Sequence, residues 1–231
     1  MATVFLIPAP LEDESLEAIP AYVLDAIKQC TVLFAENERT ARRYLKKLDK
    51  AIVIDEYEWY TIHKAEQEVK QAFINQIKAG KNIGIISEAG CPGIADPGQV
   101  LIEAAHQHGA TIKPLAGPSS ILLALMGSGM NGQQFAFVGY LPIDEQQRKK
   151  KLLQLEEYSA KQQSTQVFIE TPYRNNQLLE TILKTCKPTT RICVAANLTA
   201  ANESIVTKTV ADWKKEKPEL HKQPVIFCLM G

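Results

Sequence analysis

The sequence has no excess of either charge. Its 26 Lys+Arg and 26 Asp+Glu residues give a formal net charge of zero over 231 residues. Broad, non-specific nucleic-acid binding depends on excess basic charge, so this balance argues against that class of protein and leaves room only for a local basic patch. No apolar run approaches the roughly 18 residues that a membrane-spanning helix needs. The opening "MATVFLIPAP" lacks a basic region before its apolar run, so we expect a first strand, not a signal peptide, and no membrane partner.

Cysteine and histidine are few and lack the spacings typical of disulfide frameworks or metal sites. The five cysteines are an odd number with no CxxC pair, which fits reduced thiols in a cytoplasmic protein. His106 and His108 stand two residues apart, so a helix would point them to different sides, and His63 is far from both. We expect neither a disulfide nor a metal. The patterns GxxxxGK[ST] and GxGxxG are absent, which excludes the usual triphosphate and dinucleotide loops.

Short apolar runs alternate with helical patterns, as is typical of a parallel sheet covered by helices on both faces. Strands are expected at 3–7, 31–35, 51–55, 82–87 and 110–115. The helix after the third run has one apolar face, formed by Ala65, Val69, Ala72, Phe73 and Ile77. The last three apolar runs, 191–197, 204–210 and 224–230, are close enough along the chain to pair antiparallel. The sequence predicts two α/β domains, residues 1–115 with a mainly parallel sheet and residues 116–231 with a mixed sheet.

Two stretches rich in glycine and proline interrupt this pattern. The first, "SEAGCPGIADPG" at 87–98, follows an apolar strand, and ligands of open α/β sheets bind beyond such strand ends. Glycines let a backbone approach a ligand closely, and prolines hold the loop rigid. A tight, exposed turn would explain this loop equally well. The second stretch, 116–120, and the Pro8-Ala9-Pro10 turn are expected at the same sheet edge, and together they favour a ligand site.

Four motifs, in the same order, resemble the tetrapyrrole-methylase superfamily. "SEAGCPGIADPG" (87–98) is similar to the family's SDAGTPxIxDPG, and "PLAGPSS" (114–120) to PLPGPxA. "GYLP" (139–142) is similar to GFLP, and "FIETPYR" (168–174) to FYESPHR. The resemblance covers nearly the whole chain and is closest to the branch that methylates cytidine 2′-hydroxyls of 16S ribosomal RNA.

The resemblance implies a two-domain α/β fold, a homodimer, and S-adenosylmethionine bound in a cleft between the domains. When the family's cofactor-contacting positions are matched to this sequence one by one, the resemblance implies that the cofactor contacts Pro8, Glu88, Ala89, Gly90, Ile94, Ser119 and Ser120. Ile169, in the strand at 168–170, is expected in the other wall of the cofactor site.

The acceptor side departs from the family pattern. Where the family has EDTR, this chain has Glu36-Asn37-Glu38-Arg39, and where it has RELTKxxE, the stretch 196–203 reads "ANLTAANE". Of that charged set only Glu203 remains. Proton transfer and phosphate binding need charged side chains, so we take Glu38, Arg39 and Glu203 as the catalytic candidates. Glu36, Glu170 and Arg174 are further charged residues near motif ends, and a surface ion pair is the alternative role of each.

Three functions follow from these patterns. The first is methylation of a ribose 2′-hydroxyl of ribosomal RNA, with the small ribosomal subunit as partner. The second is methylation of a small molecule such as a tetrapyrrole or corrinoid, and the third is a non-catalytic S-adenosylmethionine-binding module. Basic clusters at 42–43, 46–47 and 148–151 would suit an RNA backbone if they share the rim of the site, but solvated helix faces explain them as well.

Overall fold

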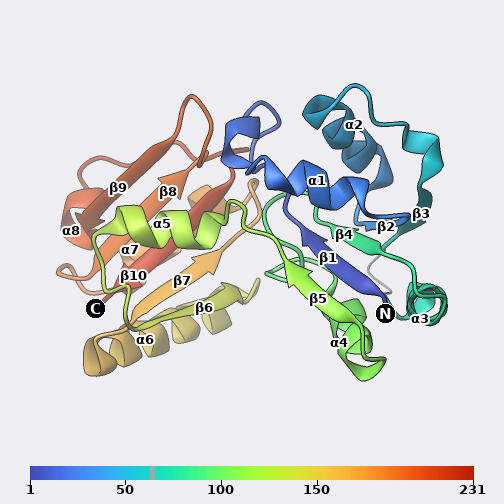
Figure 1. The fold of residues 1–231 in the computed structure, drawn as a ribbon. Coiled ribbons are helices and arrows are strands. Elements are labelled where there is room, and N and C mark those ends of the chain that lie inside the picture. Colours follow the sequence, from blue (N-terminus) through green and yellow to red (C-terminus); the bar gives the residue numbers. More distant parts are fainter. Residues whose placement is uncertain (63–65) are drawn as a thin grey trace. The chain divides into compact units, whose positions relative to one another are not determined.

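The computed structural model describes residues 1–62 and 66–231. The chain divides into two compact units, Met1–Ser119 and Ser120–Gly231, and each contains one five-stranded sheet (Figure 1). The division falls a few residues beyond the boundary expected after residue 115. His63 and Ala65 entered the expectations for metal binding and for a helix face, and both lie outside the described residues.

The first unit has a sheet in the order β3-β2-β4-β1-β5, in which every neighbouring pair is parallel. Its strands are β1 (Thr3–Ile7), β2 (Val32–Ala35), β3 (Glu58–Thr61), β4 (Ile83–Ile86) and β5 (Thr111–Pro114). Its helices are α1 (Tyr22–Lys28), α2 (Glu38–Leu48), α3 (Glu66–Lys78) and α4 (Gln99–Gln107), with 3-10 turns at Leu16–Ala18 and Ile54–Glu56. The predicted parallel sheet is confirmed.

The strand expected at 51–55 is wrong. Ile52 is buried in the hydrophobic core, but the run ends in the 3-10 turn Ile54–Glu56, and the third strand is β3, which pairs with β2. β3 is an edge strand with the sequence "EWYT". An edge strand needs less apolar surface than a central one, and aromatic residues favour strands. The stretch "EWYT" therefore forms the edge strand in place of the more apolar run at 51–55.

Each face of this sheet has its own core. One face packs against α1 and α2 through residues such as Val23, Ile27 and Leu45. The other packs against α3 and α4 through Phe73 and Leu101. The central strands β2 and β4 are buried along their whole length, as parallel strands covered on both faces should be.

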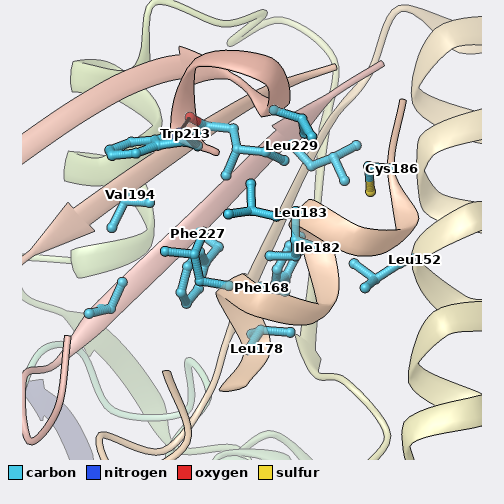
Figure 2. Close-up of a cluster of buried hydrophobic side chains, with 14 of the residues drawn as sticks. Leu152, Phe168, Leu178, Ile182, Leu183, Cys186, Val194, Trp213, Phe227 and Leu229 are labelled. Atoms are coloured by element: carbon cyan, nitrogen blue, oxygen red, sulfur yellow. Dashed lines mark hydrogen bonds between the residues drawn. The ribbon is translucent and has the colours of Figure 1, made fainter. Parts of the chain in front are cut away.

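The second unit has a mixed sheet in the order β6-β7-β10-β8-β9. Its strands are β6 (Phe135–Tyr140), β7 (Thr165–Ile169), β8 (Arg191–Ala196), β9 (Ser204–Thr209) and β10 (Val225–Met230), and its helices are α5 (Ser120–Ser128), α6 (Glu145–Gln162), α7 (Asn175–Thr185) and α8 (Val210–Trp213). β8 pairs antiparallel with β9 and β10, which confirms the predicted pairing of the last three runs. Phe168 and Phe227 stack in the core that this sheet forms with α6, α7 and α8 (Figure 2), while α5 contacts β8, β9 and β10.

Arg148 is not part of a solvated basic face. Only 2% of it is exposed, and its guanidinium donates to the Ile143 carbonyl (2.9 Å) and to the Thr181 hydroxyl (3.3 Å). It shares the buried face of α6 with Leu152, Leu155 and Ser159, at helical spacing. Only Lys149, Lys150 and Lys151 of the cluster 148–151 therefore remain for a basic patch. Among the described residues, no helix has the length and apolar character needed to cross a bilayer.

Candidate active site

The loop at 87–98 lies at the point where the first sheet changes direction. The chain leaves β1 and β2 towards α1 and α2 on one face, but it leaves β4 towards α4 on the opposite face. β4 lies between β1 and β2, so its loop diverges from both neighbouring loops at the carboxyl edge of the sheet. Such a switch point opens a crevice in which α/β proteins bind ligands.

The turn after β1 is joined to this loop. The Ala9 amide donates to the Gly90 carbonyl and the Gly90 amide to the Ala9 carbonyl, both at 2.9 Å. The Tyr44 hydroxyl on α2 donates to the Pro8 carbonyl (2.9 Å), and burial raises the pKa of this hydroxyl. Both backbone polar groups of Gly90 are therefore used inside the protein, and the residue itself is buried at a φ of 78°, so its role is to join the loop to the turn after β1.

The second glycine-proline stretch meets both segments. A Cβ added to Gly117 would overlap the Pro8 ring, with Cγ only 2.5 Å away. The Cys91 thiol lies 3.5 Å from the Pro118 carbonyl, and the Ala116 amide donates to the Tyr22 hydroxyl (2.6 Å). The segments at 8–10, 87–98 and 114–119 thus form one packed, preorganised edge, as predicted from their composition.

Acidic side chains gather at this edge. The Glu36 carboxylate accepts from the Glu88 amide (3.2 Å), and the Asn37 side chain donates to the Glu88 carboxylate (3.3 Å). Burial raises the pKa of Asp96 to about 7, and the negative charges of Glu36 and Glu88 add to the rise. Burial also raises the pKa of Glu36. The edge therefore carries a concentrated negative potential that favours a cationic ligand.

S-adenosylmethionine fits these features. Its sulfonium and ammonium groups are cations that the carboxylates would attract, and its flat adenosine needs a surface with few large side chains, such as the exposed Ala89 provides. Pro8, Glu88, Ala89, Gly90 and Ser119 all belong to the three joined segments, so the structure brings these predicted residues together. Among residues 1–62 and 66–231, no three His, Cys, Asp or Glu side chains are placed to hold a metal ion.

Ile94 lies on a different side of the loop. It is 54% exposed and lines an apolar groove of about 680 Å³ together with Cys91, Ile102 of α4 and Leu115. None of the other predicted cofactor residues lines this groove. Ile94 is therefore the cofactor candidate of the first unit that the geometry supports least.

Cys91 offers a direct test of the cofactor site. It is half-buried and burial raises the pKa of its thiol, whereas Cys30, Cys186, Cys193 and Cys228 are fully buried. We expect a maleimide to label Cys91 first, and saturating S-adenosylmethionine to leave this rate unchanged, because Cys91 lines the groove beside Ile94 and not the side of the loop that carries Glu88 and Ala89. Mass spectrometry of digested protein measures the rate. Severalfold slower labelling with the cofactor would instead place S-adenosylmethionine in the groove lined by Cys91 and Ile94.

The catalytic candidates Glu38 and Arg39 lie in the first turn of α2, directly after β2 and so at the same carboxyl edge. Asn37 caps this helix by accepting from the Arg39 amide (3.1 Å) and the Thr40 amide (3.3 Å). Glu38 is paired with Arg42 at 2.7 Å. The Arg39 side chain is exposed and forms no ion pair within the described parts of the chain, so it is the candidate that is available to an incoming anion.

The remaining candidates belong to the second unit. Ile169 is half-buried at the end of β7, and Ser120 begins α5. The exposed Glu203 carboxylate accepts from the Thr199 amide (2.7 Å) in a turn where Asn197 and Thr199 have positive φ. This contact gives Glu203 a role in holding the turn. Catalysis by Glu38, Arg39 and Glu203 stays a prediction, as does cofactor contact by Ser120 and Ile169.

Several residues at the edge did not emerge from the sequence as site candidates. The sequence places Asp96 in the proline-rich loop but does not indicate that its carboxylate lies beside those of Glu36 and Glu88. Asn37 links the ends of β2 and β4, and Gly117 allows the second loop to reach Pro8. The signal for Gly117 was its place in a Pro-Leu-Ala-Gly-Pro stretch, but the partner that requires a glycine is 109 residues away in the chain.

Comparison with known proteins agrees with this geometry. The family model described as Tetrapyrrole (Corrin/Porphyrin) Methylases matches residues 3–213. A relative from Vibrio cholerae serotype O1, named ribosomal RNA small subunit methyltransferase I, is 27% identical over 98% of this chain and 76% of its own length. One of the same name from Haemophilus influenzae is 31% identical over 72% of this chain and 58% of its own length.

Solved structures show the same fold. The methyltransferase CobJ superposes with a TM-score of 0.66 over 100% of this chain and 93% of that one, at 18% identity. The family model matches most of the chain, and the edge at 8–10, 87–98 and 114–119 fits the cofactor. This protein therefore belongs to the tetrapyrrole methylase family and is a methyltransferase that uses S-adenosylmethionine.

Proposed function

We propose that this protein transfers a methyl group to a ribose 2′-hydroxyl of small-subunit ribosomal RNA. Relatives that match 94–98% of the chain carry the name ribosomal RNA small subunit methyltransferase I. The observation that carries the proposal is the packed edge at the switch point of the first sheet, which has the exposed Arg39 beside it.

Methyl transfer requires mainly that the protein align the methyl donor with the acceptor hydroxyl. S-adenosylmethionine supplies an activated methyl group on a positively charged sulfur. The joined segments 8–10, 87–98 and 114–119 hold their shape before the ligand arrives, which lowers the entropic cost of placing it. A ribose hydroxyl is a weak nucleophile that benefits from a nearby base, and the carboxylate of Glu38 is the candidate. Arg39 would hold a phosphate next to the acceptor ribose.

The other basic residues of α2 are largely neutralised. Arg42 pairs with Glu38 and Asp55, Arg43 with Asp13, and Lys47 with Asp13 and Glu14. This helix therefore offers no broad basic patch to RNA phosphates. Of its basic side chains, all of them described, Arg39 and Lys46 are in no ion pair, and Lys46 lies in the last turn, where it donates to the Lys50 carbonyl (3.1 Å), so phosphate binding is assigned to Arg39. Recognition of RNA must then draw on contacts other than counterion release.

Transfer of a labelled methyl group tests the proposal. We expect purified protein to label small ribosomal subunits from cells that lack the gene, and not subunits from cells that carry it. A methylated 2′-oxygen cannot attack the adjacent phosphate, so the label should survive alkaline hydrolysis in a dinucleotide. Arg39→Ala should lower kcat/KM for the subunit by about 10- to 100-fold while leaving affinity for S-adenosylmethionine unchanged, because an ionic hydrogen bond to phosphate contributes about 1.5–3 kcal/mol.

Other outcomes would favour the alternatives. Label in extracted small molecules but not in RNA would support a tetrapyrrole or corrinoid acceptor, which the loss of charged residues at 196–203 favours. Cofactor binding without any transfer would support a regulatory module. The homodimer and the cytoplasmic location are also proposals, which sedimentation and cell fractionation can test.

A further inference from the structure

Three exposed rings gather at one edge of the second sheet. β6 runs parallel to β7, while β10 runs antiparallel to both β7 and β8, so β6, β7 and β8 end where β10 begins. Tyr140 ends β6 and is the register partner of Ile169, at the end of β7. Tyr173 follows β7, and His221 precedes β10. We call Tyr140, Tyr173 and His221 the aromatic edge.

These rings are open to solvent. Tyr140 is 60% and Tyr173 70% exposed. The Tyr173 and His221 rings lie 5.9 Å apart and meet edge to face, at an interplanar angle of 71°. Large apolar rings that remain exposed on a folded domain are candidates for contact with a ligand.

The loops that carry Tyr173 and His221 are fixed to each other. The Lys222 amide donates to the Pro172 carbonyl (3.0 Å), and the Asn175 side chain donates to the Gln223 carbonyl (2.7 Å). The buried Glu170 carboxylate accepts from the Arg174 guanidinium (2.6 and 3.0 Å) and holds the turn around Tyr173. Exposed rings on a rigid support lose little entropy when a flat ligand stacks on them.

The charges around the aromatic edge are balanced. Arg174 is neutralised by Glu170, and the Glu219 carboxylate accepts from the His221 amide (2.8 Å). Lys222 is exposed. A surface of this kind offers little to a duplex backbone but suits the faces of unpaired bases, which bind by stacking.

We propose that the aromatic edge stacks unpaired nucleobases of the ribosomal RNA segment that carries the methyl acceptor. This inference rests on the proposed function and adds the form of its substrate, a single-stranded segment with bases turned outward. Sequence-specific proteins commonly bind RNA in this form, because bases in a duplex are hidden in a groove too narrow for side chains. Tyr173 and Tyr140 then position the RNA through base contacts, while the transfer chemistry belongs to other residues.

Co-sedimentation with small ribosomal subunits from cells that lack the gene, whose acceptor ribose is unmethylated, tests the proposal. We expect Tyr173→Ala and Tyr140→Ala each to weaken RNA binding by about 5- to 150-fold, the range for loss of one base–aromatic stack. Tyr173→Trp should retain affinity because it keeps a ring. Tyr158→Ala, which removes a 54% exposed tyrosine from α6, is the matched control and should bind as the unsubstituted protein does. Calorimetry should show unchanged affinity for S-adenosylmethionine in all four variants.

Three results would overturn the inference, and they are distinguishable. If the unsubstituted protein methylates RNA but the alanine variants bind RNA within twofold of it, the aromatic edge is not the stacking surface and the proposed function stands. If the unsubstituted protein binds S-adenosylmethionine but neither binds nor methylates small ribosomal subunits from cells that lack the gene, both proposals fail. Loss of binding in Tyr173→Trp as well as in Tyr173→Ala would also contradict a stacking role.

Discussion

Replacing Gly117 by alanine should weaken binding of S-adenosylmethionine by about tenfold or more and lower the free energy of unfolding by about 1–3 kcal/mol. The new Cβ would overlap the Pro8 ring, which cannot turn away because a proline ring is rigid and because the Pro8 carbonyl is held by Tyr44. The strain must then separate the second loop from the turn after β1, and the cofactor surface depends on their contact. Calorimetry with the cofactor and urea unfolding measure the two effects.

Gly132→Ala is the control for this substitution. A Cβ at Gly132 would meet no atom within 4 Å, and Gly132 is not among the glycines with positive φ. This variant should bind the cofactor and unfold as the unsubstituted protein does. If Gly117→Ala bound S-adenosylmethionine with unchanged affinity, the packed edge of the first unit would not be its binding surface.

The joined loops show how far sequence could lead to the site. Composition alone indicated that the segments at 87–98 and 114–119 are stiff and bare, and the βα alternation placed them beyond strand ends; both expectations hold. The acidic cluster could not be predicted in the same way. Glu36 and Glu88 are 52 residues apart, and they meet only because β2 and β4 are neighbours in the sheet order. Strand order is a property of the whole fold.

Two errors have different causes. The run at 51–55 looked like a strand because apolar residues predict burial, but Ile52 fills the core from a loop while the polar edge strand β3 does the pairing. For Arg148, the sequence contains a pattern that indicates burial, but the neighbouring basic residues favoured a solvent-exposed helix face. Positions 148, 152, 155 and 159 recur at helical spacing on the buried face of α6, so periodicity predicted burial where the run of basic residues predicted solvent.

Asp96 should make both cofactor binding and stability depend on pH near neutrality. Burial raises the pKa of its carboxyl from 3.8 to about 7, so the folded protein holds this proton more tightly than the unfolded chain does. The stability contributed by this proton is fully present below about pH 4 and is lost as pH rises through about 7. Asp96 is partly exposed and solvent screens its charge, so the loss is on the order of 1–2 kcal/mol. Urea unfolding should show a larger decline in the unsubstituted protein than in Asp96→Asn, in which the raised pKa of Glu36 is retained.

Cofactor binding should have the opposite dependence. A sulfonium or ammonium cation at this edge favours the ionised form of Asp96 against the repulsion of Glu36 and Glu88, so binding should release a proton and tighten as pH rises from about 6 to 8. Calorimetry in two buffers of different ionisation enthalpy counts the released proton. Asp96→Asn should bind more weakly at pH 8 and lose the proton release, whereas Asp25→Asn, an exposed change on α1, should retain both. A neutral ligand would not favour ionisation of Asp96. If the affinity of the unsubstituted protein did not change between about pH 6 and 8, the cation of S-adenosylmethionine would therefore bind away from the acidic cluster.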